Sequence, residues 1–166
     1  MLQCHYCGYS RKLEKKCPNC GSSYISPFGT GTEKLEKICH AVFPKARILR
    51  MDGDTTGKKG KYEEILQDFA EEKADILLGT QMIVKGHDFP KVTLVGIMAA
   101  EQLFFQSDFQ AREYAFQILT QAAGRAGRGK LPGDVLIPSY RPEEDVLEPA
   151  LEHDYSAFYQ SEKKVR

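Results

Sequence analysis

The stretch Gln121-Ala122-Ala123-Gly124-Arg125-Ala126-Gly127-Arg128 lies near the end of a predicted helix. Its two arginines stand three positions apart, so both project from one side of a helical turn, beside glycines that let a backbone or a phosphate approach closely. Two forked cations held in this way suit a triphosphate. The alternative is a helix C-terminus closed by glycine, where arginine side chains favour the negative end of the helix dipole. The stretch alone leaves both interpretations open.

Strand and helix patterns alternate around this stretch from residue 26 to residue 155. We expect strands over 46–51, 75–79, 92–98 and 135–137, helices over 30–43, 59–72, 108–122 and 143–155, and an aromatic-rich loop over 101–107. Such alternation predicts an α/β fold in which a parallel sheet carries helices on both faces. We divide the chain into a knuckle segment (1–25), a lobe (26–140) and a C-terminal helical extension (141–166) with a frayed basic tail.

The predicted helices carry apolar stripes at helical spacing. The first opens with a capping box, Thr30 and Glu33, and ends before Pro44. We expect Cys39 to be a small buried hydrophobe. The side chains expected to pack are Leu35, Ile38, Cys39, Val42 and Phe43 on the first helix, Tyr62, Ile65, Leu66 and Phe69 on the second, and Phe109, Arg112, Phe116 and Leu119 on the third.

Composition is ordinary for a globular protein. At 166 residues the chain is long enough for one domain and a small appendage. It carries 23 basic and 23 acidic residues, so any contact with nucleic acid must come from local patches rather than from net charge. No apolar run approaches the length of a membrane span, and no signal pattern follows Met1. We therefore expect a cytoplasmic protein without membrane contact.

Four of the five cysteines form two Cys-x-x-Cys pairs, Cys4 with Cys7 and Cys17 with Cys20, each followed by glycine. Each pair places two sulfurs around one turn, and two such knuckles make a tetrahedral thiolate site for structural zinc. A redox pair and free thiols are the alternatives. We expect His5 to face solvent, because four sulfurs already complete the zinc shell.

The segment between the knuckles has a local excess of positive charge, contributed by Arg11, Lys12, Lys15 and Lys16. Tyrosines lie beside it in the sequence. Basic and aromatic side chains on a zinc ribbon can contact phosphates and stack on bases. A solvated hairpin is equally compatible with them.

The loop from Gly79 to Pro90 joins two predicted strands. Thr80 leaves the carboxyl end of the first strand, which is where ligands of open α/β sheets bind. Its hydroxyl can bind a phosphate oxygen, and Asp88 can accept a hydrogen bond from a sugar hydroxyl. The alternative is a plain connection, although its length favours a function. Another polar turn carries Asp52 and Asp54, which can bind a cation or simply cap the turn.

The ordered pair of segments Gly79-Thr80…Lys85-Gly86-His87-Asp88 and Gln121 to Arg128 resembles motifs V and VI of superfamily-two helicases. The amino-acid sequences of the zinc knuckles and of residues 79–95 are most similar to those of the PriA family of bacterial replication-restart helicases. The resemblance covers nearly the whole chain. It implies the carboxy-terminal RecA-like helicase lobe of such a protein, preceded by a small zinc-ribbon segment.

The resemblance also implies roles for individual residues. Arg128 corresponds to the arginine finger, Arg125 to its partner, and Gln121 to a residue that positions the phosphate or water. Gly86, Asp88 and Gly124 would lie at the nucleotide, Thr80 and Lys85 would contact DNA, and Thr80 and Gly86 would couple the two sites. The zinc ligands implied are Cys4, Cys7, Cys17 and Cys20.

The family's activity implies ATP and Mg²⁺ as cofactors, bound with the help of another lobe, because no Gly-Lys-Ser/Thr phosphate-binding loop occurs in this chain. It implies 3′ to 5′ movement on single-stranded and forked DNA. The partners implied are single-stranded-DNA-binding protein and primosome proteins. We expect a monomer that is inactive without the other lobe.

The chain departs from the family pattern in two places. The family usually has four Cys-x-x-Cys pairs for two zinc ions, whereas this chain has two pairs. The pairs of relatives are expected to interleave, so the two pairs here either share one zinc or belong to different zincs in the intact protein. Glu101 stands where relatives tend to have aspartate, which leaves its role open.

Two other functions remain compatible with the sequence. One is a lobe of another superfamily-two helicase or translocase that acts on RNA. The other is a non-catalytic zinc-ribbon module that binds nucleic acid.

Overall fold

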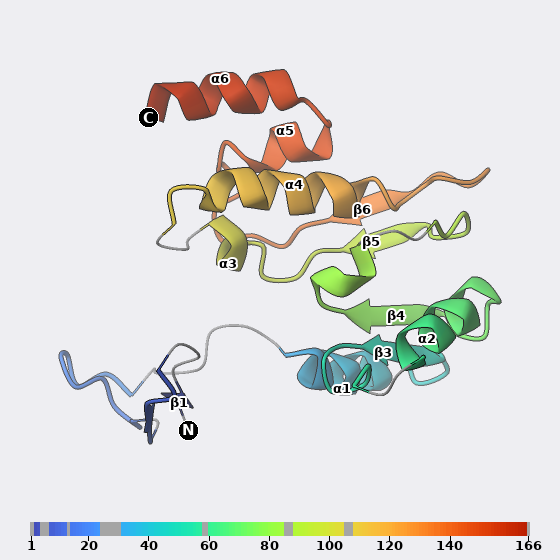
Figure 1. Cartoon of the computed structure of the whole chain (residues 1–166), viewed down its shortest axis with the longest axis horizontal. Helices are drawn as coiled ribbons and strands as arrows, with labels where there is room; N and C mark the ends of the chain where they lie inside the picture. The colour runs from blue at the N-terminus through green and yellow to red at the C-terminus, as the bar shows by residue number, and fades with distance from the viewer. Residues whose placement is uncertain are drawn as a thin grey trace.

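The computed structural model describes residues 2–3, 7–12, 14–23, 31–57, 60–84, 88–104 and 108–165. The alternation of strands and helices predicted from the sequence is confirmed (Figure 1). In chain order the elements are β1 (Leu2–Gln3), β2 (Ser10–Arg11), α1 (Thr32–Val42), β3 (Ile48–Met51), α2 (Lys61–Ala70), β4 (Ile76–Gly79), the 3₁₀ helix η1 (Gln81–Val84), β5 (Leu94–Gly96), α3 (Glu101–Phe104), α4 (Ala111–Ala123), β6 (Asp134–Leu136), α5 (Leu147–Leu151) and α6 (Tyr155–Val165).

The strands of the lobe form two parallel pairs, β3 with β4 and β5 with β6. Ile48 lies opposite Ile76, and Leu94 lies opposite Asp134. The sheet expected to run through all four strands is therefore divided, because no pairing joins β4 to β5 among the described residues. This is a correction to the predicted single parallel sheet.

An ion pair fixes the start of β3 against the start of β4. The backbone N–H of Arg47 donates to Asp75 at 2.8 Å, and its guanidinium Nη2 donates to the same carboxylate at 2.7 Å. These bonds lower the pKa of Asp75 to about 2. They hold the register of the pair at the end where both strands begin.

The second pair of strands begins at the same end as β4. The ring of Phe89, shortly before β5, packs edge-on against Phe69 at the end of α2, with 4.9 Å between ring centroids. Because α2 leads into β4, Phe69 marks the end at which β4 begins. Strands β4 and β5 thus run in the same direction, as Figure 1 also shows.

The larger hydrophobic core lies between the β5–β6 pair and the helices α4, α5 and α6, which Figure 1 shows stacked above these strands. Ile97 and Ile137 pack against it from the strand side. Its buried members are Ala100, Leu103, Phe104, Ala115, Phe116, Ile118, Leu119, Val146, Leu147, Ala150 and Phe158. The helical extension after residue 140 is thus packed into the core of the lobe.

A smaller core joins the β3–β4 pair to α2. Met51, Ile65 and Leu66 are buried there, and Tyr62 and Leu77 pack against them. Helix α1 contacts both strands but contributes no buried residue. The prediction that the apolar stripe of α1 packs against the rest of the lobe is therefore wrong. Cys39 is only half-buried, and Ile38, Val42 and Phe43 are exposed.

Three predicted boundaries differ from the structure. The segment expected as a loop over 101–107 contains the short helix α3. The helix expected over 143–155 is replaced by α5 and α6, because His153 adopts a positive φ of 57° and Asp154 caps α6 by accepting from the N–H of Ala157 at 2.9 Å. The basic tail is partly helical, since Lys163 lies within α6.

The third helix begins later than predicted, at Ala111, so Phe109 precedes it, and its side chain is largely exposed. The capping residue Thr30 falls outside the described residues. Glycine 31 takes the N-cap position of α1 without a side-chain bond. No described helix is long and apolar enough to cross a membrane.

Candidate nucleotide and nucleic-acid site

The structure brings the two sequence segments of the candidate site together. Asp88 lies between η1 and β5, and Arg128 follows α4. Arg128 Nη1 lies 3.5 Å from Asp88 Oδ1. Both side chains are exposed, at 43% for Arg128 and 65% for Asp88, so the pair contributes little to stability and is easily exchanged for another anion.

The backbone of Gly124 contacts the side chain of Arg128. Its carbonyl oxygen accepts a hydrogen bond from Arg128 Nε. A Cβ at Gly124 would lie 3.7 Å from Arg128 Nη2 and 3.3 Å from the ring of His153. The guanidinium thus contacts the Gly124 carbonyl through Nε and the exposed Asp88 carboxylate through Nη1.

The backbones of the two segments are also in direct contact. The N–H of Gly127 donates to the carbonyl of Val92 at 3.0 Å. Gly129 lies so close to Pro90 that a Cβ would stand 1.9 Å from the Pro90 carbonyl oxygen. Only glycine allows this approach. Residues 90–92 and 127–129 therefore form one packed unit.

The helix ends before the arginines. Helix α4 stops at Ala123, with Gly124 as its C-cap, so Arg125 and Arg128 lie in the turns that follow rather than on a helical face. Gln121 is exposed in the last turn of α4. Arg125 is half-buried, and Arg128 is the more exposed of the two arginines.

Thr80 lies at the opposite end of the strands. It follows Gly79, the last residue of β4, which pairs with Met51 at the end of β3. Its side chain is exposed, and its carbonyl accepts from the N–H of Ile83 at 3.2 Å. Asp88 and Arg128 lie near the end at which β5 begins. The structure thus separates Thr80 from the Asp88–Arg128 pair by the length of a strand.

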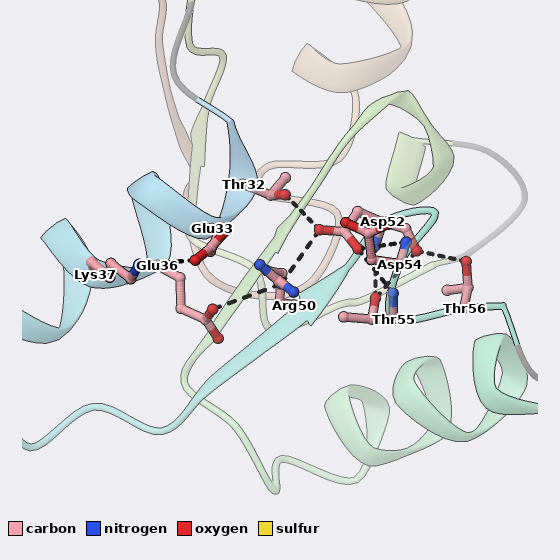
Figure 2. Close-up of polar contacts among 9 residues, drawn as sticks. All are labelled: Thr32, Glu33, Glu36, Lys37, Arg50, Asp52, Asp54, Thr55 and Thr56. Carbon is pink, nitrogen blue, oxygen red and sulfur yellow. Dashed lines mark hydrogen bonds and ion pairs between the residues drawn. The ribbon is translucent and has the colours of Figure 1, made fainter. Parts of the chain in front are cut away.

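The polar turn next to Thr80 is organised by Asp52 (Figure 2). The Asp52 side chain, in a residue only 6% exposed, accepts at Oδ1 from the N–H groups of Asp54 at 3.1 Å and Thr55 at 3.0 Å. Oδ2 accepts from the hydroxyl of Thr32 and lies 3.3 Å from Arg50 Nε. These contacts lower the pKa of Asp52, with the bond from Thr32 as the largest cause.

The alternative of a cation at Asp52 and Asp54 is not supported. Both oxygens of Asp52 already accept hydrogen bonds within the protein. Within the described ranges no three His, Cys, Asp or Glu side chains are placed to bind a metal together. The turn is a capped connection that also ties α1 to the end of β3.

Sequence comparison identifies the lobe. Residues 23–130 match the family described as the helicase conserved C-terminal domain. The chain belongs to this helicase family. The match covers both segments of the candidate site, and it agrees with an α/β lobe built on short parallel strands.

The helicase C-terminal domain is similar over nearly its whole length to proteins named replication restart protein PriA. It is 50% identical over 165 residues to the one from Bacillus subtilis (99% of this chain, 20% of the relative). It is 47% identical to the one from Chlamydia pneumoniae (98% and 22%) and 43% identical to the one from Synechocystis (100% and 20%). The suspected likeness to PriA is confirmed. The chain spans about a fifth of the length of these relatives.

Only part of the predicted zinc site of this helicase domain lies in the described residues. Cys17 and Cys20 form a knuckle: the N–H of Gly21 donates to the Cys17 carbonyl at 2.9 Å, and Gly21 has a positive φ of 70°. Hydrogen bonds from the backbone of Cys20 and of Asn19 lower the pKa of the Cys17 thiol. Cys4 lies outside the described residues, and the exposed Cys7 does not join the Cys17–Cys20 pair there.

Two further residues that the sequence predicted for the site, Lys85 and Gly86, fall outside the described residues, as does His5. Glu101, whose role the sequence left open, is buried in α3 and accepts from the N–H of Tyr140 at 2.8 Å. The bond to its own backbone N–H is the largest cause that lowers its pKa, followed by Ser139. Glu101 therefore fixes the turn after β6.

Sequence reasoning missed the contact between Gly129 and Pro90 and the bond between Thr32 and Asp52. The glycine after Arg128 was the available signal for the first, since a glycine outside a helix often marks a close backbone approach. No local pattern indicates the second, because its partners are 20 positions apart.

Proposed function

We propose that this chain is the second lobe of an ATP-dependent DNA helicase of PriA type, which acts in replication restart and primosome assembly at stalled forks. The observation that carries the proposal is the contact of Arg128 with Asp88, at an edge built by two loops in backbone contact. The similarity to PriA proteins supports it. Because those relatives are much longer, the activity belongs to the intact protein.

In the proposed site Arg128 acts as the arginine finger. It stabilises charge that develops on the transferred phosphoryl group of ATP, which another lobe would hold with Mg²⁺. Arg125 is the supporting arginine, Gln121 orients the phosphate or the water, and Gly86, Asp88 and Gly124 line the nucleotide. Asp88 keeps the arginine at the edge until a phosphate takes its place, a role that suits an exposed and weak ion pair.

The opposite end of the strands is the proposed DNA side. Thr80 and Lys85 contact the backbone of single-stranded or forked DNA, and closure of the two lobes moves the strand in the 3′ to 5′ direction. The exposed position of Thr80 beyond β4 supports this assignment. Single-stranded-DNA-binding protein and primosome proteins are the proposed partners, and a cytoplasmic monomer is the proposed state.

Replacing Arg128 by Ala or by Lys in the intact protein tests the nucleotide side. We expect the rate of DNA-stimulated ATP hydrolysis to fall by about 10³-fold or more, because neither Ala nor Lys supplies the paired N–H donors with which a guanidinium stabilises charge on the phosphoryl group. ATP binding, measured with a fluorescent analogue, should change little. The measurement is the steady-state rate of phosphate release with forked DNA present.

Lys130→Ala is the matched control, since Lys130 is exposed and lies two residues beyond Arg128. It should retain the rate of the unchanged protein. An Arg128 variant that hydrolyses ATP at full rate would refute the finger and favour a non-catalytic binding module. Equal stimulation by RNA and by forked DNA would favour a lobe that acts on RNA.

We also propose that Cys17 and Cys20 bind zinc, with Cys4 and Cys7 as the other pair of ligands. The lowered pKa of Cys17 fits a thiolate ligand, because the backbone donors that stabilise its negative charge are in place without metal. Elemental analysis of the purified protein should find about one zinc for each two Cys-x-x-Cys pairs. Cys20→Ser should reduce the zinc content, and four freely reactive thiols with little metal would refute the site.

A further inference from the structure

The backbone of His153 adopts a conformation that few side chains take. The residue lies in the connection between α5 and α6, and its φ of 57° falls in the left-handed region, which is uncommon for residues other than glycine. Its side chain is exposed, so burial in the core does not explain this conformation. A residue that its surroundings hold in a costly conformation is often part of a functional site.

The surroundings fix this connection on both sides. Before it, Ala150 of α5 is completely buried in the larger core. After it, the N–H of Asp154 donates to the carbonyl of Pro149 at 2.8 Å, and Phe158 of α6 is buried in the same core. The side chain of His153 is therefore attached to a backbone that is anchored at both ends.

The ring of His153 lies against the end of α4. Figure 1 shows the connection between α5 and α6 on the side of the molecule at which α4 ends. A Cβ at Gly124, the C-cap of α4, would lie 3.3 Å from ring atom Cε1 of His153 and 3.7 Å from Nη2 of Arg128. Because both atoms are within van der Waals reach of one point, the ring and the guanidinium are neighbours on the same face of Gly124.

Three groups thus lie around the guanidinium of Arg128. Its Nε donates to the carbonyl of Gly124, its Nη1 lies 3.5 Å from the carboxylate of Asp88, and its Nη2 lies on the side of the His153 ring. A long, exposed side chain loses considerable rotamer entropy when it is held in one orientation, and an exposed ion pair supplies little energy to hold it. A ring on a fixed backbone instead removes orientations by occupying the space that they need.

We propose that His153 is a positioning residue for ATP hydrolysis, whose ring keeps the guanidinium of Arg128 in the orientation from which it reaches the phosphoryl group on the other lobe. The inference rests on the proposed function of Arg128 as the arginine finger. His153 lies in the helical extension, beyond residue 130, at which the helicase family match ends. The extension thereby contributes to the site a side chain that the matched segment does not contain.

His153→Gly and His153→Asn in the intact protein test this role. Glycine and asparagine take the left-handed conformation readily, so both variants keep the backbone and lose the ring. We expect kcat for DNA-stimulated ATP hydrolysis to fall by about 10- to 100-fold, because a small misplacement of a catalytic group is enough for such a loss. KM for ATP, the affinity for forked DNA and the melting temperature should change little.

Glu152→Ala is the matched control, since Glu152 is the preceding exposed residue of the same connection, and it should retain kcat. A double variant separates positioning from an independent contribution. His153→Gly should cause no further loss when it is added to Arg128→Ala, because the ring acts only through the guanidinium.

The same fold loss from His153→Gly with and without Arg128→Ala would overturn the proposal. A fall in kcat that is matched by a lower melting temperature in both His153 variants would show a merely structural role and would also overturn it. Full kcat in His153→Gly beside a slow Arg128→Ala would overturn this inference alone. Full kcat in Arg128→Ala would instead refute the arginine finger, and this inference with it.

Discussion

At the scale of single residues, Asp52 is the most connected side chain of the smaller half of the lobe. It caps its own turn through two backbone N–H groups and bonds Thr32 at the start of α1 (Figure 2). Its neighbour Arg50 also approaches Glu36 of α1, at 3.7 Å. Since α1 has no buried residue, these polar contacts carry much of its attachment to β3.

Asp52→Asn should destabilise the chain by about 1 to 3 kcal/mol, because a buried hydrogen-bonded charge loses its ion pair and one strong acceptor. Urea unfolding followed by circular dichroism measures the difference. Asp54→Asn is the matched control, since Asp54 is exposed, and should stay within about 0.5 kcal/mol of the unchanged chain. Equal stability of both variants would contradict the role of Asp52.

The difference in unfolding free energy between the unchanged chain and the Asp52→Asn variant should also depend on pH. The pKa of Asp52 is lower in the folded chain than in an unfolded one, first because of Thr32. Its contribution is therefore complete above the unfolded value of about 3.9 and is lost as the pH falls from there through the folded value. Unfolding free energies should differ by a constant amount above about pH 5 and converge in more acidic buffer.

The sequence predicted the capping of this turn but not its partner. An aspartate followed by Thr55 and Thr56 after a strand is typical of a side chain that bonds its own backbone. The bond to Thr32 depends on how α1 packs, which local patterns do not determine. Likewise, the sequence predicted both segments of the candidate site. It did not predict the contact of Arg128 with Asp88, which depends on how the two segments pack.

At the scale of elements, aromatic contacts and polar bonds hold α6 to the lobe. The rings of Phe116 and Phe158 stack with 4.4 Å between centroids. Arg112 of α4 donates through Nε to Glu162 of α6 at 3.0 Å, and through Nη1 to Glu144 at 3.1 Å. The helical extension is thereby part of the folded unit rather than a loose appendage.

Phe158→Ala should lower the free energy of unfolding by about 3 to 5 kcal/mol, because the ring is buried in the larger core. Tyr159→Ala is the control on the same helix, since Tyr159 is half exposed, and should cost much less. Thermal unfolding of both variants gives the comparison. Similar losses for the two would show that α6 packs on another face.

Predictability also differed between elements. Long periodic segments such as α2 and α4 were located correctly, with Ile65, Leu66, Phe116 and Leu119 buried as expected. The helix expected over 143–155 was wrong because a positive φ at His153 and the cap at Asp154 outweigh its periodicity. The apolar stripe of α1 was placed correctly on a helix, but periodicity alone does not determine whether a stripe is buried, and Ile38 and Val42 are exposed.

At the scale of the whole molecule, the domain carries one side of a proposed two-lobed site. Arg128 and Asp88 lie on an exposed edge, and no Gly-Lys-Ser/Thr loop is present to bind phosphates.

We therefore expect the 166-residue chain alone to hydrolyse no ATP above background, with or without single-stranded DNA. Its affinity for ATP should be weak, because the arginine side contributes to the transition state more than to binding. Radiolabelled phosphate release and isothermal titration measure the two quantities. DNA-stimulated turnover by the purified chain would contradict the assignment to a single lobe.

The backbone contact between residues 90–92 and 127–129 has a mechanical consequence. Because Gly129 lies directly against the carbonyl of Pro90, the two loops cannot slide past each other and move as one rigid piece. A displacement of the loop that carries Arg128 should therefore displace residues 90–92, which lead into β5, by a similar amount.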